Sequence, residues 1–195
     1  LLGTQMIAKG LDFDNVTFVG IVNADIGLFL PDFRSGEKIF QLIYQVAGRA
    51  GRRKKQGTVF IQTYNSDDIY IKTASDLDLN KFYKISLNQR KELLYPPFNR
   101  ICRILFQGKI KTDTQILAKK IASQIQQNQF KVLGPSIAPI EKIKGLWRYH
   151  LLIKINHNKP FQFQQFFKQK IGLDFLQKTQ KGIKVTLDID PVSML

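Results

Sequence analysis

An amphipathic segment between two apolar runs constrains the fold of this 195-residue chain most strongly. The runs 16–22 and 57–63 are apolar and rich in β-branched and aromatic residues, which is typical of strands buried on both faces of a parallel sheet. The segment between them begins at Ser35, a candidate N-cap, and its apolar residues recur at helical spacing: Ile39, Leu42, Ile43, Val46 and Ala47. Strand, helix and strand in this order predict a right-handed crossover on a parallel sheet.

Two aspartates lie in the loop between the first of these strands and the helix. Loops at the carboxyl ends of parallel strands often carry function, and Asp25 and Asp32 occupy such a loop. We therefore expect one of the two carboxylates to orient active-site groups.

The end of the predicted helix is the strongest candidate for a phosphate site. Residues 45–52 read Gln-Val-Ala-Gly-Arg-Ala-Gly-Arg, so Gly48 and Gly51 leave the helix end open to a ligand. Arg49 and Arg52 are three residues apart and project from nearly the same side. Guanidinium groups are always charged and present forked donors, which suit the charge of a phosphoryl-transfer transition state. The alternative is a solvated, basic helix end.

The net charge of +15 is distributed unevenly along the chain. Residues 1–78 hold nine Lys or Arg and nine Asp or Glu, whereas residues 79–195 hold 21 basic and six acidic residues. A surplus of basic residues confined to one part of a chain indicates a surface that binds a polyanion, and nucleic acid is the expected partner. The alternative is that lysine is simply the preferred solvated residue, since Lys, Ile, Asn and Phe are all frequent here.

A helical segment with a prolyl end predicts the domain boundary. Residues 67–94 have helical periodicity with a break near 76–79, and the sequence Tyr-Pro-Pro-Phe at 95–98 must end the helix. We expect residues 79–99 to form a connector that separates 1–78 from 100–195.

The remainder predicts a small α+β domain. Strands are expected at 100–108, 132–142, 146–155 and 183–189, and helices at 113–128 and 161–175. The apolar face of the first helix is expected to consist of Ile116, Leu117, Ile121 and Ile125. The order β-α-β-β-α-β is that of a ferredoxin-like split unit. The third strand alternates, with Trp147, Tyr149 and Leu151 on one face and Arg148, His150 and Lys154 on the other.

The less apolar face of this strand is a candidate DNA-binding surface. Arg148 and Lys154 lie on it, and four further basic residues are expected nearby: Arg100, Arg103, Lys142 and Lys144. Such a face would hold phosphates without reading base sequence. Trp147 is expected either to stack on a base or to lie in the core. The remaining polar residues are expected to be structural, with the aspartates in salt bridges: His150, His157, Asp188 and Asp190.

Several segments resemble those of known helicases. Residues 45–52 resemble motif VI of the superfamily 2 helicases, and residues 3–13 resemble motif V at the expected distance before it. The amino-acid sequences of both motifs are similar to those of the PriA family of primosomal replication-restart helicases. The same family is also similar at segments 95–98, 132–135, 147–149 and 188–191. The resemblance covers nearly the whole chain. It implies the C-terminal part of a RecA-like helicase lobe, from motif V onward, followed by the small α+β domain.

The resemblance also implies roles for individual residues. Arg49 and Arg52 are expected to stabilise charge on the γ-phosphate of ATP, and Gln45 to position the phosphate or the attacking water. The other nucleotide-facing positions are Gly10, Asp12 and Gly48, and the positions that contact the DNA backbone are Thr4, Gln5 and Lys9. The residues alone leave a second interpretation of Asp12 open, a turn-forming side chain before Asn15.

The expected enzyme is an ATP-dependent 3′–5′ DNA helicase that uses ATP with Mg²⁺. The resemblance implies single-stranded and forked DNA as substrates, replication restart and primosome assembly as the process, and primosome and single-strand-binding proteins as partners. Two alternatives stay open, a RecG-like fork translocase of superfamily 2 and a non-catalytic module that docks DNA or a partner.

Some features of such an enzyme do not occur in the sequence. It has no Gly-x-x-x-x-Gly-Lys-[Ser/Thr] loop and no Asp-Glu pair, so we expect no ATP hydrolysis by this chain alone. Zinc is implied for the parent protein only, because Cys102 is the single cysteine and no metal set accompanies it. No apolar run is long enough to cross a bilayer, so we expect a cytoplasmic protein without membrane contact. Leu1 and Leu2 run straight into a turn, so the chain is expected to begin within a longer protein.

Overall fold

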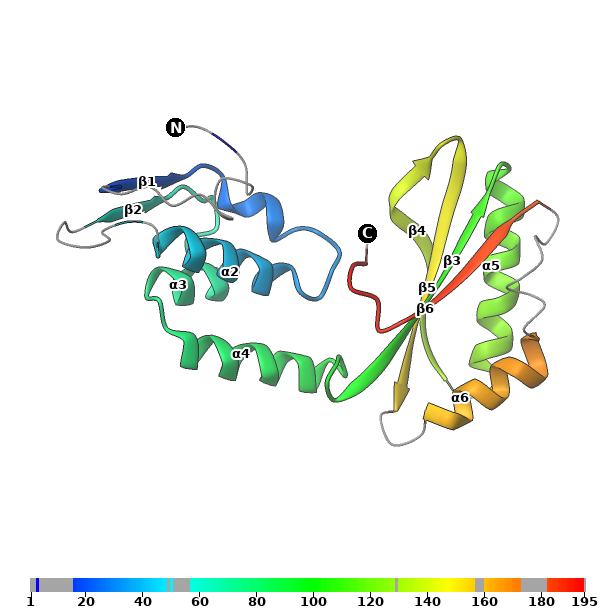
Figure 1. Ribbon diagram of the computed structural model, residues 1–195. Helices are drawn as coiled ribbons and strands as arrows, with labels where there is room; N and C mark the ends of the chain where they lie inside the picture. The colour runs from blue at the N-terminus through cyan, green and yellow to red at the C-terminus, as the bar shows by residue number, and fades with distance from the viewer. Residues whose placement is uncertain are drawn as a thin grey trace. The chain divides into compact units, whose positions relative to one another are not determined.

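The computed structural model describes residues 3, 16–48, 50, 57–128, 130–156, 160–172 and 182–194 (Figure 1). The chain is a mixed α/β structure that divides into two compact units, Leu1–Asn88 and Gln89–Leu195. Helix α4 (Leu79–Glu92) contains the residues at which the two units are divided. Each unit has its own hydrophobic core and its own sheet.

The first unit contains the predicted parallel strand pair. The predicted burial on both faces is wrong, because every second residue of each strand is exposed, Phe18 and Phe60 among them. Strand β1 (Phe18–Ile21) pairs in parallel with β2 (Thr58–Ile61), and helix α2 (Ser35–Ala47) lies between them in the chain. The short 3₁₀ helix η1 (Ala24–Gly27) follows β1. Ser35 is the first helical residue and Arg34 the N-cap, so the predicted N-cap is one residue off. The Ser35 hydroxyl donates to Leu30 O at 2.7 Å.

The core of the first unit joins α2 to two later helices. Phe40 of α2 stacks on Phe82 of α4 with ring centroids 3.9 Å apart. Helix α3 (Ile69–Ser75) begins at the N-cap Asp68, whose carboxylate accepts the N–H groups of the first turn. The predicted break between the two helices is confirmed and contains Leu77, with a positive φ of 53°.

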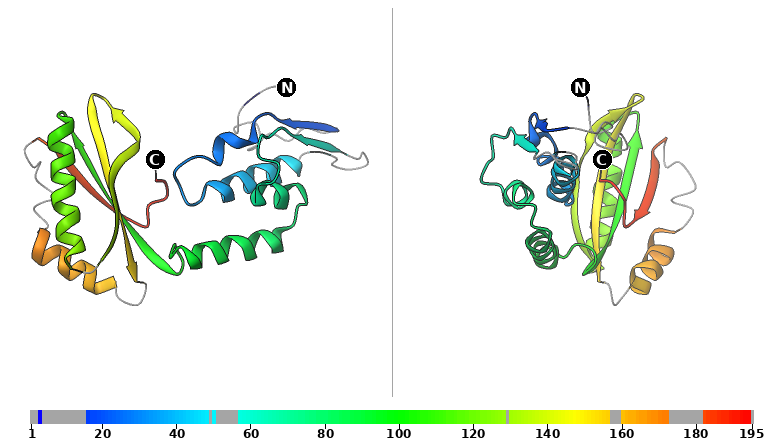
Figure 2. Two further views of the ribbon diagram at one scale, coloured as in Figure 1. Left: turned by 180° about the vertical axis from the view of Figure 1, so that it is seen from behind. Right: turned by 60° about the vertical axis from the view of Figure 1, so that its left-hand side comes forward.

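The second unit is a four-stranded antiparallel sheet with helices on one face (Figures 1 and 2). The strands lie in the order β4-β5-β3-β6, and every neighbouring pair is antiparallel. The strands are β3 (Asn99–Gly108), β4 (Lys131–Ile143), β5 (Leu146–Asn156) and β6 (Lys184–Ile189). The helices are α5 (Lys111–Gln126), α6 (Pro160–Phe166) and the π-helical segment η2 (Phe167–Ile171).

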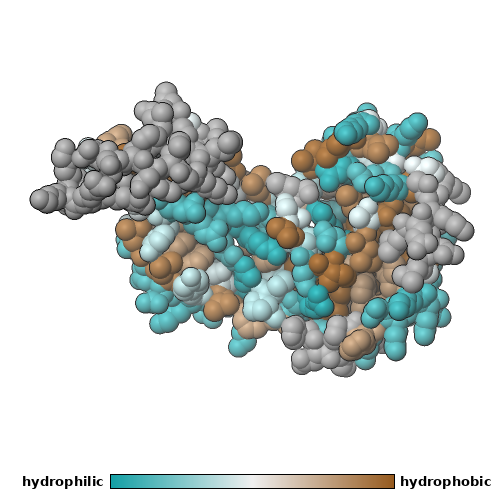
Figure 3. All heavy atoms as spheres, viewed as in Figure 1, coloured by the Kyte–Doolittle hydropathy of each residue, from teal (hydrophilic) through white to brown (hydrophobic). Residues whose placement is uncertain are grey.

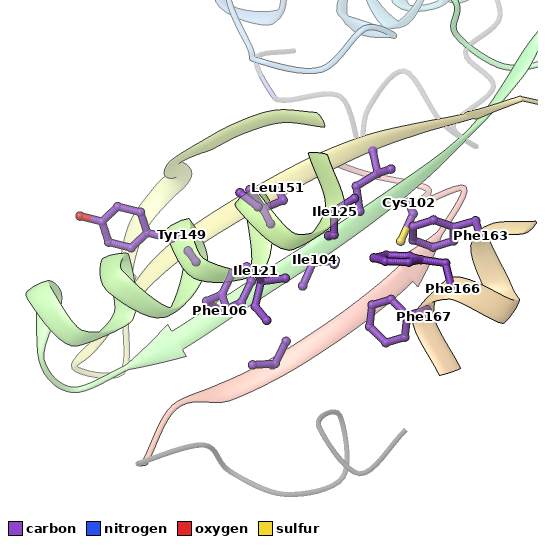
Figure 4. Close-up of a cluster of buried hydrophobic side chains, with 14 of the residues drawn as sticks. Cys102, Ile104, Phe106, Ile121, Ile125, Tyr149, Leu151, Phe163, Phe166 and Phe167 are labelled. Carbon is purple, nitrogen blue, oxygen red and sulfur yellow. The ribbon is translucent and has the colours of Figure 1, made fainter. Parts of the chain in front are cut away.

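The core of this unit lies between the sheet and its helices (Figure 4). Alternate residues of β3 and β5 point into it, as the sequence pattern of β5 predicts, and Cys102 is fully buried there. Burial raises the pKa of the Cys102 thiol. The helix face predicted for α5 is partly wrong: Leu117, Ile121 and Ile125 pack on the core, but Ile116 is exposed.

Candidate nucleic-acid interface

Helix α2 ends with the two described residues of the predicted nucleotide site. The N–H of Gly48 donates to Tyr44 O at 3.1 Å, and both Gln45 and Gly48 are exposed. A Cβ built on Gly48 would lie 3.5 Å from Tyr44 O, an ordinary contact, so the local fold does not require glycine there. The remaining predicted residues lie outside the described part of the chain, and their roles stay predictions: Arg49, Arg52, Thr4, Gln5, Lys9, Gly10 and Asp12.

Asp25 ties together the loops that follow β1 and β2. Its buried carboxylate accepts hydrogen bonds from Thr63 Oγ1 at 2.8 Å, from the Tyr64 N–H at 2.9 Å and from Asn65 Nδ2 at 2.7 Å. The Asn65 bond is the main reason that the pKa of Asp25 lies below its ordinary value. The loop that Asp25 holds lines a hollow of about 410 Å³ together with Phe29.

Asp32 fixes the start of α2. Lys38 Nζ donates to its carboxylate at 2.7 Å, and the N–H of Arg34 donates at 3.0 Å. Burial raises the pKa of Asp32, but the hydrogen bond from Lys38 and that from Arg34 outweigh burial and leave the pKa lowered. Both aspartates therefore have local partners, and each orders a loop at the carboxyl end of a strand.

The basic residues of the second unit lie on more than one surface. The register places Arg148 opposite Gln107 and Lys154 opposite Ile101, on the sheet face that points away from α5. Arg103 shares this face, as predicted. Arg100 does not, because its register matches that of the core residue Cys102, whereas Lys142 and Lys144 lie at the end of the β4–β5 hairpin.

Arg148 and His150 are buried on this open face. The Arg148 side chain is only 5% exposed, and its Nη1 donates to Ile140 O at 3.0 Å. Within the described part of the chain, Arg148 Nε and His150 Nδ1 have no hydrogen-bond partner. Burial, followed by the charge of Arg103, lowers the pKa of both groups, and Arg148 also lowers that of His150. Arg148 thus places a positive charge beneath the surface of the open face, whereas the lowered pKa favours neutral His150.

Lys154 joins β5 to the prolyl junction that follows α4. Its ammonium donates to Leu93 O and lies 4.2 Å from the centre of the Tyr95 ring. Burial, followed by the charge of Lys131, lowers the pKa of Lys154. The ammonium therefore has partners inside its own unit.

Both C-terminal aspartates form salt bridges, as the sequence predicts. Asp188 lies 3.6 Å from Arg103, and Asp190 accepts from Arg100 Nε at 2.8 Å. Asp190 also accepts the Ile101 N–H at 2.9 Å. These pairs offset part of the positive charge near β3.

Trp147 has neighbours that sequence reasoning missed. Its ring is half-buried, with Lys111 Nζ 4.4 Å and Lys142 Nζ 4.8 Å from its centre. Lys111, the first residue of α5, also pairs with Glu141 at 3.0 Å. The signal for Lys142 is present in the sequence, because a two-residue turn at 144–145 places it directly opposite Trp147.

The described residues contain no group of three His, Cys, Asp or Glu side chains that could hold a metal ion. Among the helices in the described ranges, none combines the length and the apolar character that crossing a membrane requires.

Known proteins match the chain from end to end. Replication restart protein PriA of Bacillus subtilis (strain 168) is 40% identical over 198 residues, which cover 100% of this chain and 24% of that protein. The protein of the same name from Borreliella burgdorferi is 36% identical, covering 100% and 29%. That of Rickettsia typhi is 35% identical, covering 98% and 29%. The chain thus spans less than a third of the length of these relatives.

A family model matches the part of the chain that forms the second unit. The model is described as the primosomal protein N C-terminal domain, and it matches residues 91–192, which is more than half of the chain. The chain therefore belongs to the family of the primosomal protein N C-terminal domain.

Proposed function

We propose that the chain is the C-terminal portion of an ATP-dependent 3′–5′ DNA helicase that restarts replication at stalled forks. The observation that carries this proposal is the end-to-end match to relatives named replication restart protein PriA. Their name does not favour a RecG-like translocase or a non-catalytic docking module. Single-stranded and forked DNA are the proposed substrates, primosome and single-strand-binding proteins the proposed partners, and the cytoplasm the proposed location.

The proposed architecture is the end of a RecA-like lobe at 1–78, a connector at 79–99 and a ferredoxin-like domain at 100–195. Parallel pairing of β1 with β2 across α2 supports the first part. The antiparallel strand order β4-β5-β3-β6 supports the last, because a split β-α-β unit places its third strand between the first two. The division of the chain after Asn88 supports a boundary within the connector.

The proposed nucleotide site uses the motif at the end of α2. Arg49 and Arg52 stabilise the γ-phosphate, Gln45 orients the phosphate or the attacking water, and ATP is bound with Mg²⁺. Two features of the described residues support it. Gln45 and Gly48 are exposed, and Gly48 has no local steric reason to be glycine. The other proposed nucleotide-facing residues are Gly10 and Asp12, and zinc is proposed for the parent protein only.

The proposed DNA contacts lie in both units. Thr4, Gln5 and Lys9 contact the DNA backbone by resemblance to motif V. Arg148 and Lys154 contribute positive charge to the open face of the sheet, and the excess of 21 basic over six acidic residues in 79–195 supports a polyanion partner.

The test is Arg49→Ala in the full-length helicase. Loss of an arginine that stabilises the transition state should lower kcat for ATP hydrolysis by roughly 10³-fold or more. DNA binding, measured separately by fluorescence anisotropy, should change little. Arg53→Ala removes a neighbouring charge outside the motif, and this matched control should retain most of the ATP turnover.

Unchanged ATP turnover in Arg49→Ala would overturn the helicase assignment and favour the docking module. The 195-residue chain alone should show no ATP hydrolysis, because it contains neither a phosphate loop nor an Asp-Glu pair. A colourimetric phosphate assay with and without single-stranded DNA measures this directly.

A further inference from the structure

The turn of the β4–β5 hairpin contains a lysine in an unfavourable conformation. Ile143 pairs with Leu146, and the two residues between them, Lys144 and Gly145, have φ values of 48° and 79°. Two-residue turns with positive φ at both positions favour Asn, Asp or Gly at the first, because other side chains are strained there. Within the described part of the chain, Lys144 has no ion pair or side-chain hydrogen bond that offsets this cost. Backbone strain at Lys144 that nothing within the unit offsets suggests that its side chain contacts a binding partner.

Other cations lie close to the turn of the same hairpin. Lys142 and Lys111 approach the Trp147 ring from β4 and from α5. Glu141 is the only acidic residue between 131 and 147, and it is already paired with Lys111. The hairpin therefore presents an excess of positive charge around a half-buried aromatic ring.

Exposed apolar side chains accompany this charge. Ile137, Ile140 and Ile143 of β4 are 44%, 45% and 37% exposed, and none belongs to a core cluster. Figure 3 shows hydrophobic and hydrophilic side chains intermixed at the end of the second unit where Figure 1 places this hairpin. A partner that fits the surface carries negative charge together with accessible flat or apolar faces.

We propose that the β4–β5 hairpin, together with Lys111 of α5, binds single-stranded nucleic acid. Lys142 and Lys144 contact backbone phosphates, and Trp147 stacks on a base once its lysine neighbours turn to the phosphates. Single strands fit better than a duplex because their base faces are free to meet Trp147. The inference rests on the proposed function and narrows its DNA surface, since Arg148 and Lys154 already have partners within the unit.

Trp147 is the only tryptophan of the chain, so its fluorescence reports directly on this site. Titration of the 195-residue chain with oligothymidylate should quench the emission, whereas an abasic oligomer of equal length should bind more weakly and quench little. Trp147→Ala should weaken binding, measured by anisotropy of a labelled oligomer, by at least about fivefold. Trp147→Phe keeps a ring and should recover part of this loss.

The charge on the hairpin is tested with a matched pair of double variants. Lys142→Ala with Lys144→Ala should weaken binding roughly tenfold at low salt. The slope of the logarithm of affinity against the logarithm of salt concentration should fall by the equivalent of about two phosphate contacts. Lys119→Ala with Lys120→Ala removes equal charge from exposed positions of α5 and should have a much smaller effect. Equal losses in the two double variants, or a preference for duplex over single strands, would overturn the hairpin site.

Assays of the full-length protein distinguish failure of the proposed helicase function from failure of the hairpin site. If it lacks DNA-dependent ATP turnover, the proposed function fails. If the wild-type protein turns over ATP with DNA and the hairpin variants bind single strands as tightly as it does, the hairpin site alone fails. Circular dichroism of each variant shows whether it is folded.

Discussion

The two units bury charge in opposite ways. In the first unit the buried charges are carboxylates with several short hydrogen bonds, as at Asp25 and Asp32. In the second unit the buried groups are basic, and Arg148 Nε and His150 Nδ1 have no hydrogen-bond partner in the described ranges. Satisfied carboxylates order the loops around them, whereas a buried cation without an acidic partner mainly contributes a positive field.

This difference fits the different ligands proposed for the two units. A nucleotide site needs loops held in one geometry, and Asp25 provides that at the carboxyl ends of β1 and β2. A site for the nucleic-acid backbone needs a positive field more than fixed geometry. Substitutions at the buried groups should show whether they act in these two ways.

The largest effect on stability is expected for Asp25→Ala. Three donors, from Thr63, Tyr64 and Asn65, would lose their shared acceptor, and Thr63 and Asn65 are only partly open to water that could replace it. The urea midpoint should fall more than for any other variant discussed below. Asp67→Ala is the control, because the Asp67 side chain is 94% exposed and its pair with Lys72 is at the surface. If both variants lose equal stability, the network at Asp25 does not order these loops.

Acid should destabilise the second unit through His150. The pKa of His150 lies below its ordinary 6.5, so the unfolded chain takes up this proton first as the pH falls. The free energy of unfolding should therefore be constant above about pH 6.5 and decrease below it, by at most about 1.4 kcal/mol per pH unit for one proton. The charged groups near His150 are Arg103 and Arg148, with Asp188 paired to Arg103 and neutral Ser136 opposite on β4.

The carboxylates of the first unit should respond at lower pH. The pKa values of Asp25 and Asp32 lie below their ordinary 3.8, so their contribution is present above that pH and is lost as the pH falls further. Urea unfolding between pH 5 and 8 should isolate the effect of His150, and His150→Gln should flatten the profile. A variant profile as steep as that of the wild type would assign the acid response to other groups.

A smaller effect is expected for Lys154→Met. The variant keeps the aliphatic stem but loses the hydrogen bond to Leu93 O and the contact with the Tyr95 ring. Because the ammonium also pays a desolvation cost, the net loss should be only about 1 kcal/mol in urea unfolding. Lys184→Met, at an exposed position of β6, should change the free energy of unfolding by less than about 0.5 kcal/mol. Equal changes in both variants would show that the junction contact does not stabilise the unit.

Periodicity predicted most of the elements. Helix α2, the parallel pair of β1 and β2, the break between α3 and α4 and the alternation of β5 all follow local patterns of apolar residues. Local patterns do not show which turn of a helix meets the sheet, so Ile116 was placed on the wrong side of α5. The contact of Lys111 with Trp147 was missed for the same reason, because it joins a helix start to a strand start.

The burial of Arg148 was also not predictable from alternation. Strand alternation places it on the less apolar face, which suggested an exposed side chain. Between Ile137 and Lys142, however, the register of β4 against β5 shifts, and Ile140 O in this irregular segment accepts from Arg148 Nη1. A bulge of this kind depends on tertiary packing, and the sequence gives little sign of it.

Among the variants of buried charged groups, the smallest change in stability is expected for Arg148→Met. The variant loses one hydrogen bond to Ile140 O, but it also removes a buried cation whose Nε has no partner among the described residues, and Met fills a similar volume. The two effects should nearly cancel, leaving the free energy of unfolding within about 1 kcal/mol of the wild type in urea. Arg148→Ala should lose more, because it leaves a cavity beneath β4. If Arg148→Met is instead as destabilising as Asp25→Ala, the two units do not differ in how their buried charges stabilise them.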